Sequence, residues 1–222
     1  MSTASSAPSA LSADRVTLDR RVPPLGGFNL TYLGIELKRR LRNRRTLFFT
    51  IAFPVVMYVI IGLRLRDEQL TETPVAAGGV SVAAYIMVSM AMYGAMMSAT
   101  QTGAAVALER TQGWSRQLRL TPLNPLVNII IKMIAGMVLG LLAVVVTYAA
   151  GAISGIQLSV GQWIGTGLVG WVLASAVFTT LGLFVGYLMP SENAAQVTSL
   201  VVVFLSFLGG LFYPLSSMPD FM

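Results

Sequence analysis

Five long apolar runs, separated by short polar segments, constrain this chain more than any other feature. A transmembrane helix needs about 20 predominantly apolar residues to cross a hydrocarbon core of about 30 Å. The first run is only marginally long enough, and the second is so long that its helix must tilt or project beyond the bilayer. We therefore expect an all-α polytopic membrane protein with five transmembrane helices, at residues 47–63, 80–108, 126–153, 163–188 and 194–211.

The composition supports this reading and excludes several chemistries. Charged residues make up 11 % of the sequence and hydrophobic residues 55 %, whereas soluble domains carry about 25 % charged residues. The sequence has no cysteine and no histidine, so disulfides, thiolate chemistry and the usual metal ligands are excluded.

Carboxylates are missing from the interiors of the expected spans, because Glu109 and Glu192 lie at span ends. An ion-coupled carrier would need carboxylates inside the membrane, and a membrane enzyme would need a catalytic constellation. The sequence therefore predicts a protein that is not an enzyme, with no metal site, and a chain that binds no cofactor itself.

The net charge of +6 is concentrated near the N-terminus. Nine of the fifteen basic residues precede Thr46, and six of them lie between Lys38 and Arg45. A basic cluster next to an apolar span is a cytoplasmic topology signal beside anionic lipid, and no aromatic–basic platform accompanies it, so we expect no nucleic-acid partner. We expect a multi-pass protein of the cell membrane, bacterial in origin, with a cytoplasmic N-terminus and, after five spans, a C-terminus outside.

Three regions follow from this pattern. Residues 1–27 are rich in Ser, Ala and Pro and predict a disordered cytoplasmic tail. Residues 28–45 predict an amphipathic interfacial helix, because Leu30, Leu33, Leu37 and Leu41 recur at helical spacing among basic residues. A plain positive flank of the first span is the alternative. Residues 46–222 form the expected transmembrane domain.

Two polar or broken stretches interrupt the apolar pattern. Residues 109–125, ERTQGWSRQLRLTPLNP, predict a short basic helix on the membrane surface, from about Gln112 to Leu120 and stopped by Pro122. The end of the chain from Gly209 is broken by Gly and Pro, which is typical of an interfacial or re-entrant segment that packs against protein.

Several residues inside the spans carry narrower predictions. Pro54 should kink the first span, and Lys132 should reach the cytoplasmic interface, with a substrate-binding lysine as the alternative. Residues of the second span are a candidate path for hydrophobic cargo, with ordinary helix packing as the alternative: Met90, Tyr93, Met97 and Gln101. Glycine pairs four residues apart predict close helix contacts at Gly136/Gly140, Gly151/Gly155, Gly161/Gly165 and Gly182/Gly186.

Two of these stretches resemble one family. The loop Glu109-Arg110-x-x-Gly113, continuing to Leu118-Arg119-Leu120-Thr121-Pro122-Leu123, resembles the first cytoplasmic loop of ABC-2 type transporter permeases. These are the membrane halves of ATP-driven exporters, including drug-resistance permeases of the daunorubicin type. The ending from Gly210 to Pro219 is similar to the extracellular re-entrant segment that precedes that family's sixth span. We expect that sixth span to be absent from this chain, which stops at Met222.

The resemblance implies roles for particular residues. The ATPase-coupling loop would comprise Glu109, Arg110, Gly113, Trp114, Arg116, Leu118, Arg119, Thr121 and Pro122, with Glu109 and Arg110 capping the second span and Arg116 and Arg119 on the ATPase. The re-entrant segment would comprise Gly209, Gly210, Phe212, Tyr213, Pro214, Met218 and Pro219.

The resemblance also implies a function. The chain would be the permease subunit of an ABC exporter that moves a drug, antibiotic or lipid out of the cytoplasm. The sequence has no GxxxxGK[ST] motif, so ATP and Mg²⁺ would bind to a separate ATPase subunit, and a second permease copy would complete the assembly. The alternative is a non-transporting membrane scaffold or immunity-type protein.

Overall fold

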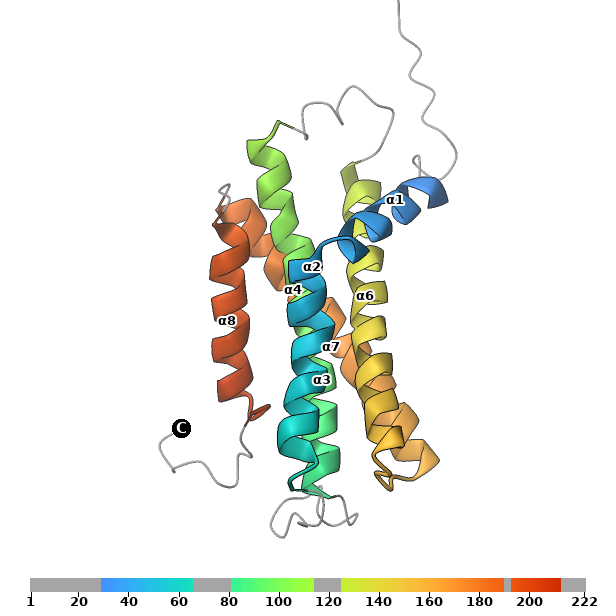
Figure 1. Cartoon of the computed structure of the whole chain (residues 1–222). Coiled ribbons are helices and arrows are strands. Elements are labelled where there is room, and N and C mark those ends of the chain that lie inside the picture. The colour runs from blue at the N-terminus through green and yellow to red at the C-terminus, as the bar shows by residue number, and fades with distance from the viewer. Residues whose placement is uncertain (1–28, 66–80, 114–124, 190–192, 213–222) are drawn as a thin grey trace, which may run out of the picture.

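The computed structural model describes residues 29–65, 81–113, 125–189 and 193–212. These residues form a helical bundle (Figure 1), in agreement with the all-α prediction. The helices are α1 (Leu30–Leu41), α2 (Arg44–Leu47), the π-helical turn η2 (Phe48–Ala52), α3 (Phe53–Met57), the π-helical turn η3 (Tyr58–Gly62), α4 (Val82–Thr111), α6 (Pro125–Ile153), α7 (Val160–Leu188) and α8 (Ala194–Leu208).

Four helices in the described part are long and apolar enough to cross a membrane: Arg44–Gly62, Val82–Thr111, Leu126–Ile153 and Val160–Leu188. They confirm four of the five predicted spans. α8 occupies the place of the fifth but has 15 residues, which is about 22 Å at the helical rise and short of a 30 Å core. The predicted end at Leu211 is wrong, because Leu208 is the last helical residue.

Short capping motifs set the ends of these helices. The Ser81 hydroxyl accepts a hydrogen bond from the Ala84 amide at the start of α4, and Ser159 forms a capping box with Gln162 at the start of α7. α8 ends in a Schellman motif, in which Gly210 has a φ of 72° and the Leu211 amide donates to the Ser206 carbonyl. The glycine fits because side chains disfavour positive φ.

α4 is the central helix. In its most apolar window 72 % of the residues are buried, against 22 to 44 % in the other three candidate spans. It is also the least apolar of the four, because its side chains face other helices while the outer helices present large hydrophobic residues to lipid. The polar stretch of α4, from Ser98 to Thr102, therefore lies inside the bundle.

Small residues let α4 approach its neighbours closely. A Cβ added at Gly182 of α7 would lie 2.3 Å from the Thr100 carbonyl oxygen, and one at Gly136 of α6 would lie 2.9 Å from the Thr102 hydroxyl. These contacts confirm the Gly136/Gly140 and Gly182/Gly186 pairs as helix contacts. The prediction is wrong for Gly161 and Gly165, because no neighbouring helix among the described residues has an atom within 4 Å of a Cβ added there.

The hydrogen-bond pattern of the first span changes at Pro54, where the sequence predicts a kink. Pro54 lies in the first turn of α3, directly after the π-helical turn η2. A proline cannot donate a hydrogen bond and crowds the carbonyl four residues earlier, here that of Thr50, and the wider π turn accommodates this. The Thr50 carbonyl faces α4, where a Cβ added at Gly94 would lie 2.6 Å from it.

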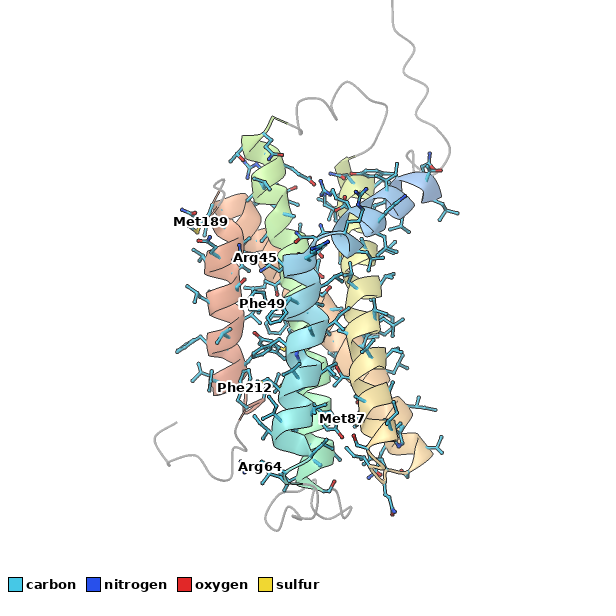
Figure 2. All side chains as sticks on the ribbon, viewed as in Figure 1. Arg45, Phe49, Arg64, Met87, Met189 and Phe212 are labelled. Carbon is cyan, nitrogen blue, oxygen red and sulfur yellow. The ribbon has the colours of Figure 1, made fainter. Side chains whose placement is uncertain are left out.

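The helices alternate in direction through the bundle. α1 lies across the end at which α4 finishes and α6 begins (Figure 1). Arg45 and Met189 lie toward this end, whereas Arg64 lies at the opposite end (Figure 2). The polar loop at residues 109–125 therefore starts and finishes at the end of the bundle that carries α1.

Candidate functional site

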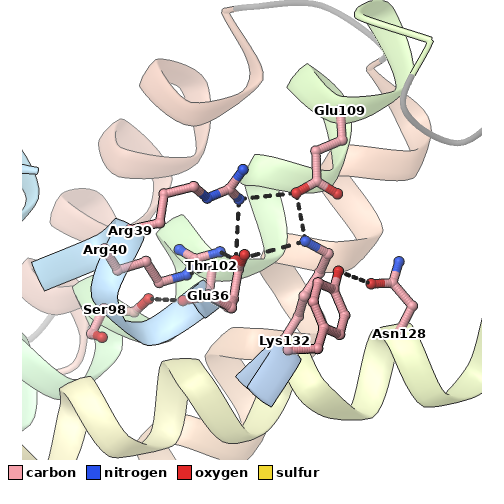
Figure 3. Close-up of polar contacts among 9 residues, drawn as sticks. Glu36, Arg39, Arg40, Ser98, Thr102, Glu109, Asn128 and Lys132 are labelled. Atoms are coloured by element: carbon pink, nitrogen blue, oxygen red, sulfur yellow. Dashed lines mark hydrogen bonds and ion pairs between the residues drawn. The ribbon is translucent and has the colours of Figure 1, made fainter. Parts of the chain in front are cut away.

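Five ionisable side chains meet at the α1 end of the bundle, and we call them the charge cluster: Glu36, Arg39, Arg40, Glu109 and Lys132 (Figure 3). Three belong to α1, one lies two residues before the end of α4, and one lies two turns into α6. The cluster therefore joins α1 to both helices that flank the polar loop.

The two carboxylates share their partners. Glu109 Oε1 accepts hydrogen bonds from Lys132 Nζ at 2.5 Å and from Arg39 Nη2 at 3.0 Å. Glu36 Oε1 accepts from Arg39 Nη2 at 3.1 Å and lies 3.7 Å from Lys132 Nζ. Arg40 donates to the same Glu36 oxygen from Nε at 3.1 Å and from Nη2 at 2.8 Å. Arg39 and Lys132 thus each bridge both carboxylates.

Most of the cluster is buried, so its charges interact strongly. Lys132 is 1 % exposed, Glu36 is 4 % exposed and Glu109 is 8 % exposed. Burial alone would raise the pKa of the Glu36 carboxyl, but the charges of Lys132, Arg40 and Arg39 outweigh it and hold that pKa below its ordinary value of 4.5. Glu36 is therefore an anion at neutral pH. With two carboxylates and three cations, the cluster carries one positive charge in excess.

A neutral hydrogen bond extends the contact between α1 and α6. The Tyr32 hydroxyl donates to Asn128 Oδ1 at 2.7 Å. Burial and the nearby carboxylates Glu109 and Glu36 raise the pKa of Tyr32 to about 12, so the hydroxyl keeps its proton and remains a donor. α1 is therefore fixed to α6 by this neutral hydrogen bond and by the Glu36–Lys132 ion pair.

The described part of the predicted coupling loop differs from the expectation. Gln112 is the C-cap of α4 and Gly113 has a φ of 72°, so a new helix does not begin at Gln112. Neither Glu109 nor Arg110 caps α4: Glu109 belongs to the charge cluster, and Arg110 Nη1 donates to the Tyr187 carbonyl of α7 at 2.9 Å. The remaining predicted coupling residues, Trp114, Arg116, Leu118, Arg119, Thr121 and Pro122, lie outside the described residues.

Two members of the cluster were misjudged or missed from the sequence. Lys132 does not reach the interface as predicted, because Glu109 and Glu36 hold it inside the protein. The leucine spacing gives Glu36 no role, yet it is buried together with Arg40. One signal for this was present in the sequence, because Glu36 is an acidic residue that lies between Leu33 and Leu37 on the face of α1 that packs inward.

The proposed cargo path lies within packed protein in this structure. Met90, Tyr93 and Met97 are each 3 % exposed, and the half-buried Gln101 donates to the Ala195 carbonyl of α8 at 3.3 Å. They are close to α8 and to the first span, since Tyr93 contacts the ring of Phe53 at 5.6 Å. The four residues lie along one face of α4.

The described part of the predicted re-entrant segment turns back toward α4. The Phe212 ring stacks on Phe207 with centroids 4.7 Å apart and meets the edge of Tyr93 at 5.4 Å (Figure 2). The Tyr85 hydroxyl donates to the Gly210 carbonyl, and Gly209 is the C-cap of α8. Tyr213, Pro214, Met218 and Pro219 lie outside the described residues.

Comparison with known proteins shows the family of this chain. The family model of the ABC-2 type transporter matches residues 30–222. A protein of Bacillus subtilis (strain 168) named "Putative transport permease YvfS" is 30 % identical over 194 residues, which cover 84 % of this chain and 74 % of the relative. No solved structure matches the chain significantly. The chain therefore belongs to the ABC-2 type transporter family and is a membrane transport permease.

Proposed function

We propose that this permease is the membrane-spanning subunit of an ABC exporter that moves a hydrophobic or amphipathic substrate, such as a drug, an antibiotic or a lipid, out of the cytoplasm. Energy comes from a separate ATPase subunit that binds ATP and Mg²⁺, because this sequence has no phosphate-binding loop of its own. A second permease copy completes the assembly, and the N-terminus and the loop at 109–125 face the cytoplasm.

The charge cluster is the observation that carries this proposal. The chain leaves α4 two residues after Glu109 and re-enters the bundle at the start of α6, seven residues before Lys132. The Glu109–Lys132 contact of 2.5 Å closes the base of the loop, and Arg39 adds α1 to the same contact. A force on the loop therefore acts on α1, α4 and α6 together, as a rigid-body movement of these helices requires.

α4 is well placed to turn that push into movement of a substrate path. It is the central helix, and its buried methionines lie in clusters that include residues of the first span and of α8, along with residues of α6 and α7. Methionine side chains adapt to varied apolar surfaces. In the conformation seen here these residues pack on protein, so export requires α4 to separate from α8 or the first span.

Charge reversal in the loop tests ATPase coupling. We expect R116E and R119E, alone or together, to prevent capture of an ATPase with a Walker A motif by the affinity-tagged permease, and to abolish ATP-dependent dye or drug efflux from cells. R64E is the matched control, because Arg64 is exposed at the opposite end of the bundle. If capture and efflux survive in R116E/R119E as in R64E, the loop is not the ATPase contact.

A further inference from the structure

α1 divides its basic residues into two groups. Arg39 and Arg40 turn toward Glu36 and Glu109, as part of the charge cluster. Lys38 and Arg42 on the same segment, and Arg44 and Arg45 just after it, are exposed, and no carboxylate among the described residues lies within ion-pairing distance of any of the four. These four side chains are accessible to an anion from outside the described residues.

An apolar groove lies beside the same helix. It has a volume of about 260 Å³ and runs between α1 and α6, where its lining is entirely aliphatic. Leu37 and Leu41 form the α1 side, and Val138, Leu142 and Val145 are among the α6 residues opposite. Leu41, Leu142 and Val145 are 38, 37 and 53 % exposed, so the groove opens onto the surface that faces lipid.

The two features adjoin along the helix. Lys38 and Arg42 each follow directly after a groove leucine, Leu37 and Leu41, about 100° further round the helix. A molecule that filled the groove with hydrocarbon and carried an anion at its end would therefore satisfy both at once. An aliphatic cavity gives no hydrogen bonds to water or to a polar ligand.

We propose that this groove is a binding site for an anionic phospholipid, with an acyl chain along Leu37, Leu41 and α6 and the headgroup phosphate on Lys38 and Arg42. A zwitterionic phospholipid carries its own cation beside the phosphate and gains less from these two side chains. Basic residues beside a membrane attract anionic lipid, and here the groove fixes where one such lipid binds. This site does not depend on the ATPase.

The headgroup arm of the test uses the purified full chain in neutral detergent, titrated with dioleoyl phosphatidylglycerol or dioleoyl phosphatidylcholine and read out by native mass spectrometry. We expect phosphatidylglycerol to bind more tightly to the wild-type protein. In K38Q/R42Q that preference should fall on the order of tenfold, given the attraction of each basic residue to anionic lipid. R64Q should keep the wild-type preference.

The acyl-chain arm uses V145W, which places an indole in the groove. Its matched control is V177W, because Val177 is similarly exposed on α7 and lies outside the groove. We expect V145W to retain several-fold less dioleoyl phosphatidylglycerol than V177W. Glycerol phosphate without acyl chains should bind neither protein measurably.

Three results would overturn the proposal. Equal binding of the two lipids by the wild-type protein would show that the headgroup is not recognised. Retention by V145W equal to that by V177W would exclude the groove. Unchanged lipid preference in K38Q/R42Q, together with lost capture of the ATPase, would show that these side chains bind an acidic protein surface. K38Q and R42Q alter exposed side chains, so this arm does not depend on tolerance of a tryptophan.

Discussion

Arg39 and Lys132 each contact both carboxylates of the charge cluster, which makes these contacts interdependent. Removing two charges from water is costly, and the cost is recovered only when each buried charge keeps its partners. Glu109 also lies in the last turn of α4, where the negative end of the helix dipole disfavours an anion. The cations of the cluster compensate for both effects.

We expect K132M to be strongly destabilising, because it leaves Glu109 and Glu36 buried with fewer cations. The loss should be about 3–5 kcal/mol, which is typical when one partner of a buried ion pair is removed. The double variant K132M/E109Q should recover part of this loss, since the orphaned carboxylate is also neutralised. Equilibrium unfolding in mixed detergent measures both.

R44Q is the control for K132M, because Arg44 is exposed and its change should stay within about 0.5 kcal/mol. If K132M were as mild as R44Q, or the double variant worse than K132M, the cluster would not hold the helices together as described.

The lowered pKa of Glu36 predicts a dependence of stability on pH. A carboxyl whose pKa is lower in the folded protein contributes stability that is complete above its unfolded pKa, near 4.5, and is lost as the pH falls through the lowered folded value. Wild-type protein should therefore lose stability below about pH 4.5. The loss should be smaller in E36Q, which is less stable at pH 7 but lacks this carboxyl. If the free energy of unfolding of the two proteins fell equally as the pH is lowered, the lowered pKa of Glu36 would be contradicted.

α4 tolerates its polar stretch because its hydroxyls are satisfied locally. Thr100 donates to the Met96 carbonyl at 2.6 Å and Thr102 to the Ser98 carbonyl at 2.8 Å, each four residues back in the same helix. Such bonds avoid an unsatisfied donor in the apolar interior. Because these short side chains bond to their own helix, the backbones of neighbouring helices can approach α4 closely.

The close contact between α4 and α7 predicts a large effect of one methyl group. G182A would place a Cβ 2.3 Å from the Thr100 carbonyl oxygen, so the helices must move apart, at a cost of about 1–3 kcal/mol or more. G165A, also in α7, adds a Cβ that meets no other described residue within 4 Å, and it should be neutral or slightly stabilising because alanine favours helix. Unfolding in mixed detergent compares the two, and equal stabilities would refute the contact.

Across the whole bundle, contacts between distant segments define two ends. At one end the charge cluster joins α1 to the last turn of α4 and to α6. Toward the other end, Phe212 returns from α8 to Tyr93 of α4. α4 is common to both, so a displacement at the loop must act on the aromatic contact through this helix.

If α1, the end of α4 and the start of α6 move as one body, a covalent cross-link between α1 and α6 should not impair ATP-dependent transport. The chain has no native cysteine, so Y32C/N128C supplies the only thiol pair, at positions that are hydrogen-bonded in the native protein. After cross-linking with a short bifunctional thiol reagent, ATP-dependent efflux by the proposed complex should match that of the uncross-linked variant. Loss of efflux on cross-linking would show that α1 and α6 separate during transport.

How far the sequence predicted the fold can be judged from individual elements. The apolar runs located α4, α6 and α7 well, because burial in lipid requires about 20 apolar residues whatever the neighbours are. The leucine spacing located α1, although the helix ends at Leu41 and not at Arg45 as predicted. It did not locate the inward face, since Leu30 and Ile35 are exposed while Glu36 and Arg40 are buried. Apolar periodicity cannot show which side of a helix faces lipid and which faces protein, because both are apolar surroundings.

The sequence by itself therefore determined the helical class, four of the spans, the family and the position of the polar loop, because these depend on local composition and on motifs contiguous in the chain. Only the tertiary structure decided that Glu36, Glu109 and Lys132 meet, although they are separated by up to 96 positions in the chain. A charge next to an apolar run is drawn either to the interface or to an opposite charge inside the protein. The choice depends on which partners the packing brings within a few ångströms.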